Sequence, residues 1–264
     1  MKFKLKKRLS YKDIYIKSSI FLIIFILLLT FMTIKNVDVS HASIILPENV
    51  DSLSILKPKY FANKVSVAFT FDDGPNKERT IKLVDALEER GMSATFFMIA
   101  NKMNYDKETV KYVYSSSSEI GYHSLFHKEM HKQSVATIKK EFQISNDIFF
   151  SITGDYFKYT RPPYGSYSSA VIKSLETPFF TWDLDTLDWK NKSVERIINY
   201  VINNYKDGSI ILFHDSYDTT VEAAITLMDL LLEKDVQVMS ITELANIKNI
   251  TLENYKVYRS FVQN

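Results

Sequence analysis

Short strand-like segments alternate with helix-like segments from about residue 65 to residue 248, and this alternation limits the possible folds more than any other feature. Apolar runs such as ATFFMIA (94–100) and SIILF (209–213) are separated by charged stretches with apolar residues at helical spacing. Strands that alternate with helices in this way form βαβ units with parallel strands. We therefore predict an α/β fold, a small distorted (β/α) barrel of about seven βα units, with an open doubly wound sheet as the alternative.

The first 42 residues differ from the rest of the chain in charge and hydropathy. They hold eight of the 33 Lys and Arg residues and two of the 31 acidic residues, which leaves residues 43–264 with a net charge of −4. A mildly acidic body argues against nucleic acid as a partner. Residues 20–34, IFLIIFILLLTFMTI, are almost wholly apolar. We predict a basic cytoplasmic leader followed by a transmembrane or signal helix within residues 1–42.

The charge distribution also predicts where the remainder of the chain lies. The basic residues concentrate on the N-terminal side of the apolar run, which places that end in the cytoplasm and the rest outside. We favour a single-pass protein of the cell membrane with its catalytic domain outside; the alternative is secretion after cleavage behind Ala42, because small residues stand at 40 and 42. Residues 43–64 are predicted as a linker, 65–248 as the folded domain, and 249–264 as a C-terminal tail.

Ionisable residues follow most of the predicted strands at the point where each strand ends. Because the carboxyl ends of parallel strands face the same side, these residues are expected to converge on one rim. The chain has no cysteine, so a metal there would be held by His, Asp or Glu. The residues are Asp72 and Asp73, His123 and His127, Arg161, Asp188, and His214.

Each of these features has a simpler interpretation when it is taken alone. Asp-Asp-Gly-Pro is an ordinary turn sequence, and two histidines four residues apart are commonly a surface pair. RPPYG (161–165) can be a stiff turn, and the acids of DLDTLDW (183–189) can favour a helix start. His214 can be a structural histidine in the core. Their joint position after successive strands favours an active site with a bound metal.

The ordered motifs resemble those of the polysaccharide deacetylases of carbohydrate esterase family four, the NodB homology domain. The resemblance runs from about Val65 to Leu244 and implies the NodB-like barrel. Tyr122 stands where Asn often precedes the first His, Ser124 replaces a commoner Thr, and Asp235 occupies a frequent Gly position. The matching motifs are TFDDGP (70–75), HSLFH (123–127), RPPYG (161–165), DTLDW (185–189) and LFHD (212–215).

The resemblance implies the parts of a hydrolytic centre. Asp73, His123 and His127 would hold one divalent metal ion, with zinc expected. Such a site keeps positions open for water and substrate. Asp72 would act as the general base and His214 as the general acid.

Further residues take supporting roles in the same family pattern. Arg161 would pair with Asp72, and Asp188 would orient His214. The main-chain N–H of Tyr164 would stabilise the developing oxyanion. Trp189 and Leu212 would shape the pocket for the acetyl methyl group. Asp185 and Asp215 are further candidates for supporting groups.

Together, the motifs and the N-terminal segment predict a metal-dependent hydrolase that removes N-acetyl groups from an extracytoplasmic polysaccharide. Peptidoglycan amino sugars are the first choice of substrate, because a tethered enzyme outside the membrane meets the cell wall first. Exopolysaccharide poly-N-acetylglucosamine, chitin oligomers and acetylated xylan are alternatives. An alternative of another class is a non-catalytic glycan-binding protein of the cell wall, which would be expected to lose some of the acids or histidines retained here.

Overall fold

The computed structural model describes residues 64–263. The basic leader, the apolar segment 20–34, the site behind Ala42 and nearly all of the predicted linker lie outside these residues. Within residues 64–263, no helix combines the length and apolar character needed to cross a membrane.

Strands and helices alternate along the described chain, as the sequence pattern predicts. Two 3₁₀ turns, η1 (Met130–Lys132) and η2 (Pro163–Gly165), interrupt the connections. The elements in order are β1 (Ser66–Gly74), α2 (Lys77–Glu89), β2 (Thr95–Met98), α3 (Ala100–Tyr105), α4 (Lys107–Ser115), β3 (Glu119–Tyr122), α5 (Val135–Thr153), α6 (Ser169–Ile172), β4 (Phe179–Phe180), β5 (Leu184–Asp185), α7 (Val194–Asn204), β6 (Ile210–His214), α8 (Asp218–Glu233), β7 (Gln237–Met239), α9 (Ile241–Ile247) and β8 (Val257–Tyr258).

Local sequence signals mark the ends of several helices. The Ser134 side chain caps the start of α5 by accepting a hydrogen bond from the Thr137 N–H. Gly154, with φ 76°, ends the same helix in the left-handed conformation that glycine adopts without steric cost. Ser240 and Glu243 form a capping box at the start of α9. These caps satisfy backbone groups that the helices leave unpaired.

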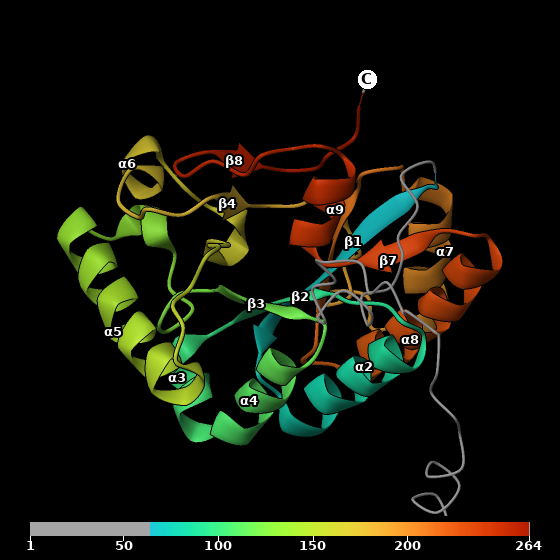
Figure 1. Cartoon of the computed structure of the whole chain (residues 1–264), viewed down its shortest axis with the longest axis horizontal. Coiled ribbons are helices and arrows are strands. Elements are labelled where there is room, and N and C mark those ends of the chain that lie inside the picture. The colour runs from blue at the N-terminus through green and yellow to red at the C-terminus, as the bar shows by residue number, and fades with distance from the viewer. Residues whose placement is uncertain (1–63, 264) are drawn as a thin grey trace, which may run out of the picture. The chain divides into compact units, whose positions relative to one another are not determined.

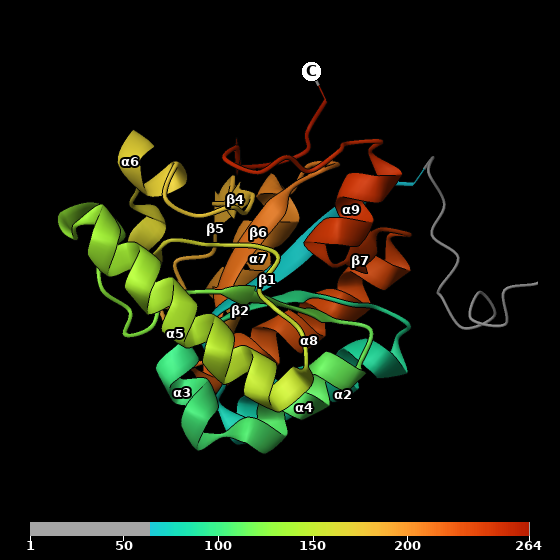
Figure 2. The same cartoon turned by 60° about the vertical axis from the view of Figure 1, so that its left-hand side comes forward.

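All strand pairs in residues 64–263 are parallel, which confirms the predicted α/β fold with a parallel sheet. The strand order is β3-β2-β1-β6-β5, and β7 pairs with the first residues of β1. Figures 1 and 2 show the strands at the centre, with α2, α4, α5 and α8 outside them. The carboxyl ends of the strands therefore lie on one side.

The short segment that contains β4 and β5 connects the β3 edge of this sheet with β6. β4 is connected to β3 through single bridges at Thr160, whereas β5, a few residues after β4, pairs with β6. Residues 156–160 thus form no regular strand and contribute only the two bridges at Thr160. The Arg161 N–H still donates to the Tyr122 carbonyl, but Pro162 and Pro163 come next, and a proline lacks the N–H needed to extend the ladder.

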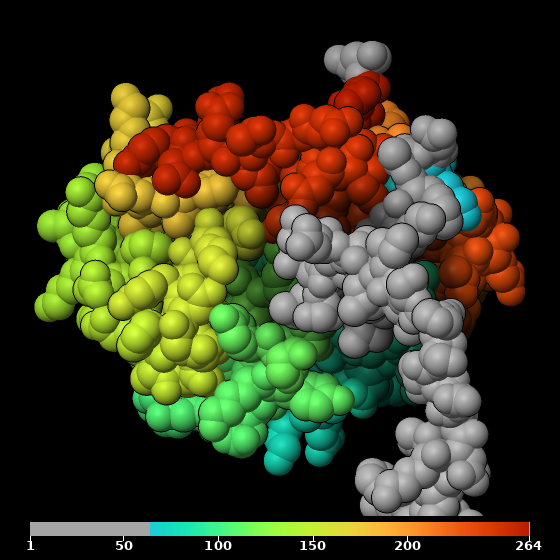
Figure 3. All heavy atoms as spheres, viewed as in Figure 1, coloured from blue at the N-terminus to red at the C-terminus, as the bar shows by residue number. Residues whose placement is uncertain are grey.

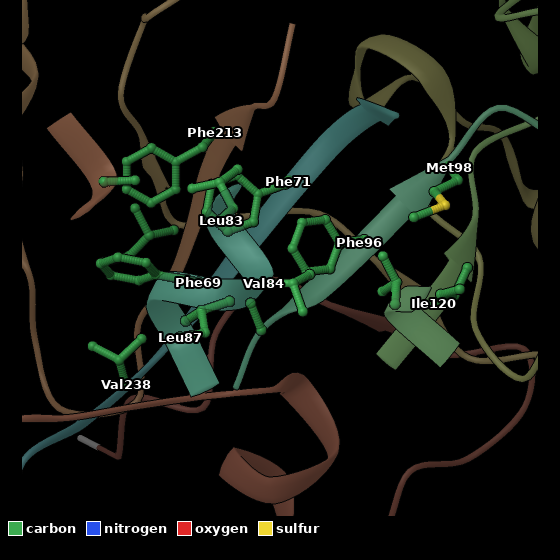
Figure 4. Close-up of a cluster of buried hydrophobic side chains, with 14 of the residues drawn as sticks. Phe69, Phe71, Leu83, Val84, Leu87, Phe96, Met98, Ile120, Phe213 and Val238 are labelled. Carbon is green, nitrogen blue, oxygen red and sulfur yellow. The ribbon is translucent and has the colours of Figure 1, made fainter. Parts of the chain in front are cut away.

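The main core lies between the sheet and its outer helices. Phe71 of β1 stacks on Phe96 of β2, with ring centroids 5.1 Å apart, and on Phe213 of β6 at 5.4 Å. Leu83 and Leu87 of α2 are fully buried against this cluster, as Figure 4 shows. Burial of such large side chains is the main favourable term in folding.

Alternation along β1 sends its other residues to the opposite face. Ala68 packs with Phe97 and Phe180 in a second buried cluster. Thr70 and Asp72 follow Ala68 at intervals of two, so Asp72 stands at the carboxyl end of this row. The strand thereby places a carboxylate at the rim without exposing its length to water.

Residues 249–263, which the sequence predicts as a tail, pack against the folded domain. β8 pairs with β4, and the Phe261 side chain is buried in the second cluster. The Phe261 N–H also donates to the Gly208 carbonyl at 2.7 Å. Figures 1 and 3 show this segment, in red, lying against the yellow region that contains β4.

Candidate active site

A pocket of about 330 Å³ opens at the carboxyl ends of the strands. It contains most of the site residues that the sequence analysis predicted, and Arg161 and Asp188 lie directly behind its walls. The lining residues are Asp72, Asp73, His123, His127, Tyr164, Trp182, Asp185, Trp189, Leu212, His214 and Tyr217.

Asp73, His123 and His127 present one ligand atom each to a common point. Asp73 Oδ1 lies 3.1 Å from His127 Nε2 and 3.5 Å from His123 Nε2, and all three ligand atoms lie within 4.8 Å of one another. Tetrahedral ligands bound at 2.0–2.1 Å are separated by about 3.4 Å. Asp73 Oδ1 is buried and accepts no hydrogen bond from a described residue. The three residues therefore fit a divalent metal ion.

The backbone at Asp73 explains how two adjacent aspartates can face the same pocket. Successive strand residues point to opposite faces, but Asp73 has φ 74° and the pairing of β1 with β2 shifts between Asp72 and Gly74. Lys102 Nζ supports this turn by donating to the Asp73 carbonyl at 2.7 Å. Asp72 keeps its inward strand direction while Asp73 is turned toward the histidines.

Gly74 and the buried Asp215 fix the base of this loop. A Cβ at Gly74 would lie 2.7 Å from Asp215 Oδ2, so a glycine is required for this close approach. The Asp215 carboxylate accepts hydrogen bonds from Asn76 and Thr80. Burial raises the pKa of Asp215 to about 6, which these hydrogen bonds partly oppose. Asp215 thus packs against Gly74, next to the proposed ligand Asp73, and does not line the pocket. Asp185 does line the pocket.

A hydrogen bond to the main chain orients His123. Its Nδ1 lies 2.8 Å from the Arg161 carbonyl oxygen, so Nδ1 carries the proton and Nε2 turns its lone pair toward Asp73. Burial alone would raise the pKa of Asp73, but His123 and His127 outweigh it and hold that pKa far below its ordinary range. The surroundings of Asp73 therefore favour its ionised carboxylate, which is the form that binds a metal ion.

Asp72 is held by a fully buried arginine. Arg161 Nη1 donates to Asp72 Oδ1 and to Thr70 Oγ1, both at 2.8 Å, and Nη2 donates to the Thr181 carbonyl at 3.0 Å. Burial lowers the pKa of Arg161, and the Asp72 carboxylate opposes that effect. The other carboxylate oxygen, Oδ2, lies 3.6 Å from His123 Nε2. Asp72 therefore has one oxygen fixed and one directed toward the metal ligands.

His214 and Asp188 form a second charged pair in the pocket. Asp188 is fully buried; its Oδ1 lies 2.7 Å from His214 Nδ1, and its Oδ2 accepts from the His214 N–H and Thr220 Oγ1. Burial tends to lower the pKa of His214, but the hydrogen bond and charge of Asp188 raise it to about 9. The imidazole is consequently protonated at neutral pH, with Nε2 free.

Aromatic and apolar side chains complete the pocket. Leu212 is buried in its wall, and Trp189 and Tyr164 remain 49% and 65% exposed at its mouth. Tyr164 has φ 61°, in the short turn η2. Exposed rings beside a polar pocket can pack against the apolar faces of a sugar. The pocket can therefore hold an uncharged sugar ring against these aromatic side chains and beside its Asp and His side chains.

The sequence analysis missed two lining residues, Trp182 and Tyr217. Trp182 ends the apolar segment PFFTW (178–182), and its place after β4 (Phe179–Phe180) is the same signal that marks the other site residues. Tyr217 follows the LFHD motif by two positions. His131 lies four residues after His127, as His127 lies four residues after His123. It contacts Ser166 and Glu129 and is not one of the three converging ligands.

Comparison with known proteins agrees with this geometry. Residues 60–178 match the sequence model of a family described as polysaccharide deacetylase. A peptidoglycan-N-acetylglucosamine deacetylase of Bacillus cereus is 30% identical over 195 residues, which cover 71% of this chain and 91% of that protein. The chain belongs to the polysaccharide deacetylase family. The match includes most of the length of that relative, so the shared unit is the domain described above.

Other members of the polysaccharide deacetylase family are longer than this chain. The peptidoglycan-N-acetylmuramic acid deacetylase PdaC of Bacillus subtilis is 32% identical over 186 residues, which are 70% of this chain but 40% of that protein. The chain thus spans less than half of the length of such relatives.

The fold of this family member also has solved counterparts. A family 4 acetyl xylan esterase of Clostridium thermocellum, solved in complex with a cobalt ion, matches with a TM-score of 0.70 and 28% identity, over 74% of this chain and 98% of that one.

Proposed function

We propose that this protein is a metal-dependent hydrolase that removes N-acetyl groups from the amino sugars of peptidoglycan. One observation carries the proposal: the Asp73, His123 and His127 group lies in the same pocket as Asp72 and His214. Two relatives named as deacetylases of peptidoglycan N-acetylglucosamine and N-acetylmuramic acid support this substrate. The proposed reaction releases acetate and leaves a free amine on the sugar.

Asp73, His123 and His127 would hold the metal ion, because their ligand atoms fit one cation. When bound, a divalent metal supplies Lewis-acid polarisation of the acetamide carbonyl and lowers the pKa of water. Nitrogen and oxygen ligands of this kind suit zinc, which we propose as the ion in the cell. The structure of the acetyl xylan esterase in complex with a cobalt ion supports a metal site in this protein.

Asp72 is the residue placed to accept the proton of the attacking water. Arg161 pairs with Oδ1 and thereby leaves Oδ2 as the free basic atom beside the metal ligands. Asp72 can thus remove a proton at a fixed position without binding the metal itself.

His214 is the residue placed to protonate the leaving amine. It is charged at neutral pH because of Asp188, and it lines the pocket together with Asp72. The Asp188 carboxylate holds Nδ1, so the proton on Nε2 is the one available to substrate. We therefore propose that the base and the acid belong to different charged pairs, Asp72 with Arg161 and His214 with Asp188.

The remaining residues position the acetyl group. The main-chain N–H of Tyr164 is the proposed donor to the developing oxyanion, because η2 bends the chain at the pocket. Leu212 and Trp189 supply an apolar wall for the acetyl methyl. The rings at the mouth would pack on the sugar.

We also propose that the enzyme acts outside the cytoplasm, held at the cell membrane by residues 20–34. The proposal rests on the apolar run and on the basic residues that precede it. Peptidoglycan would then be the polymer nearest to the catalytic domain.

Acetate release from purified cell wall tests the proposed function. The full-length protein is expected to release acetate from peptidoglycan faster than from acetylated xylan or chitin oligomers. A chelator should abolish release, and added zinc should restore it, because three residues hold the ion needed by the reaction. Binding to the wall without acetate release, in metal-loaded protein, would support the non-catalytic glycan-binding alternative instead.

The pH dependence of the reaction tests the acid role of His214. An acid must be protonated, so activity should fall as the pH rises through the pKa of His214. Asp188→Asn removes the charge that raises this pKa to about 9, so the alkaline limb of kcat/KM should move down by at least about one pH unit. An Asp229→Asn control changes the net charge equally at a surface pair with Arg90. An unmoved alkaline limb in Asp188→Asn would contradict the assignment.

A further inference from the structure

A second pocket, of about 320 Å³, adjoins the catalytic pocket. Tyr164 and Trp182 line both pockets and so form a shared wall. Tyr167 and Arg259 line the second pocket only. Its volume falls at the lower end of the range for small-ligand sites. A polymer bound in the catalytic pocket can continue into this second pocket.

The C-terminal segment brings Arg259 to the catalytic rim. β8 runs parallel to β4, and the Thr181 N–H donates to the Tyr258 carbonyl at 2.9 Å. Arg259 follows β8 directly, so it lies past the carboxyl end of a strand, as the catalytic residues do. Arg259 Nε donates to the Trp182 carbonyl at 3.0 Å, which fixes the guanidinium beside the shared wall.

The outer part of this guanidinium is available to a ligand. Arg259 is exposed and forms no ion pair with any residue of the described range 64–263. Burial raises the pKa of Asp183, and the positive charge of nearby Arg259 partly opposes this rise. However, the Asp183 carboxylate already accepts hydrogen bonds from Ser209 Oγ at 2.8 Å and the Ile210 N–H at 2.7 Å. Within residues 64–263, Nη1 and Nη2 of Arg259 therefore have no ion-pair partner, whereas Nε is held by Trp182.

The ring beside Arg259 is closely packed. A Cβ at Gly165 would lie 2.9 Å from Trp182 Cη2, so the indole rests directly on this glycine. Tyr167, which also lines this pocket, is 41% exposed. A fixed indole, an exposed phenol and a guanidinium fork together suit a sugar ring that carries a carboxylate.

We propose that the second pocket is a subsite for a carboxylate-bearing sugar next to the sugar that is deacetylated. Arg259 pairs with the carboxylate, and Trp182 and Tyr167 contact the sugar ring. The inference rests on the proposed function and narrows it, because a neutral polymer offers Arg259 hydrogen-bond acceptors but no charged partner. In peptidoglycan the carboxylate has two possible sources, the lactyl ether of a muramyl residue or the peptide stem attached to it.

Three soluble substrates separate these possibilities. The first is a peptide-free tetrasaccharide of alternating N-acetylglucosamine and N-acetylmuramic acid, the second its lactyl methyl ester, and the third the same glycan with peptide stems. Chitotetraose is the neutral reference. Metal-loaded full-length protein should show a KM about fivefold lower for a carboxylate substrate than for the ester, the size expected for a partly exposed charged pair.

Arg259→Gln should remove this preference by raising KM for the carboxylate substrate about fivefold, with kcat unchanged. Activity on chitotetraose and on the ester should stay the same, which excludes a loss of folded protein. Arg259→Lys should keep part of the preference, since it retains the charge but not the fork. Arg196→Gln, an exposed arginine on α7, is the matched control and should change nothing.

The outcomes distinguish this inference from the function on which it rests. A preference for the free lactyl acid assigns the lactyl carboxylate, and a preference that needs the stem assigns the peptide. Equal KM values for acid, ester and stem-bearing glycan in an active enzyme would overturn the subsite alone. No acetate from any of the substrates would overturn the proposed function.

Discussion

Asp72→Asn is expected to bind metal like the unaltered protein and to lose about 10²- to 10⁴-fold in kcat. Asp72 is not among the three converging ligands, so their number does not change. An amide cannot take a proton from water, although its oxygen can still accept the hydrogen bond from Arg161 Nη1. Metal content by mass spectrometry and acetate release on the same preparation measure the two effects.

The buried Arg161 requires a separate control for stability. Replacing the carboxylate leaves the guanidinium less compensated, so Asp72→Asn should also unfold at a lower temperature. Thr70→Val removes the other acceptor of Arg161 Nη1 and should cost about 1 kcal/mol of stability while keeping most of the turnover. A nearly unchanged kcat in folded Asp72→Asn would mean that another group is the base.

Asp73 substitutions are expected to abolish metal binding and activity together. Asp73→Ala removes one of three ligands, so the affinity for zinc should fall by at least about 100-fold, measured by calorimetry. Asp73→Asn is the cleaner variant, because Asn tolerates the left-handed backbone at φ 74° better than Ala does. It removes the charge with little change of shape.

His131→Ala is the matched control for these metal measurements. His131 continues the four-residue spacing of the histidines but pairs with Ser166 and Glu129. The variant should retain one metal ion per chain and full activity. An undiminished metal affinity in Asp73→Asn and Asp73→Ala, or a loss of metal in His131→Ala, would show that the ion lies elsewhere.

Several features of the fold and site could be predicted from the sequence because their signals are local. The alternation of apolar runs with helical spacing predicts βα units, and strand ends are visible where polar residues interrupt an apolar run. Parallel strands then bring Asp72, Asp73, His123 and His214 to one rim, as the structure shows. The pairs Arg161–Asp72 and Asp188–His214, expected from the family resemblance, also form.

Other features depended on contacts between distant segments and had no local signal. The sequence of residues 156–160 favours a strand, but the segment contributes only two single bridges at Thr160, because the sheet there is completed by β4. Residues 249–263 lack a clear periodicity, yet β8 finds its partner in β4 almost 80 residues earlier in the chain. A two-residue strand is stabilised by the sheet edge that it meets and not by its own composition.

The sequence alone thus determined which residue types stand at the ends of the strands, since that pattern follows from the two-residue period of a strand. Tertiary structure decided how those residues meet: the left-handed turn at Asp73, the shared wall formed by Trp182, and the place of Arg259 beside it. The physical reason is that backbone reversal and packing are set by neighbours far along the chain, whose side chains limit the space and supply the hydrogen bonds.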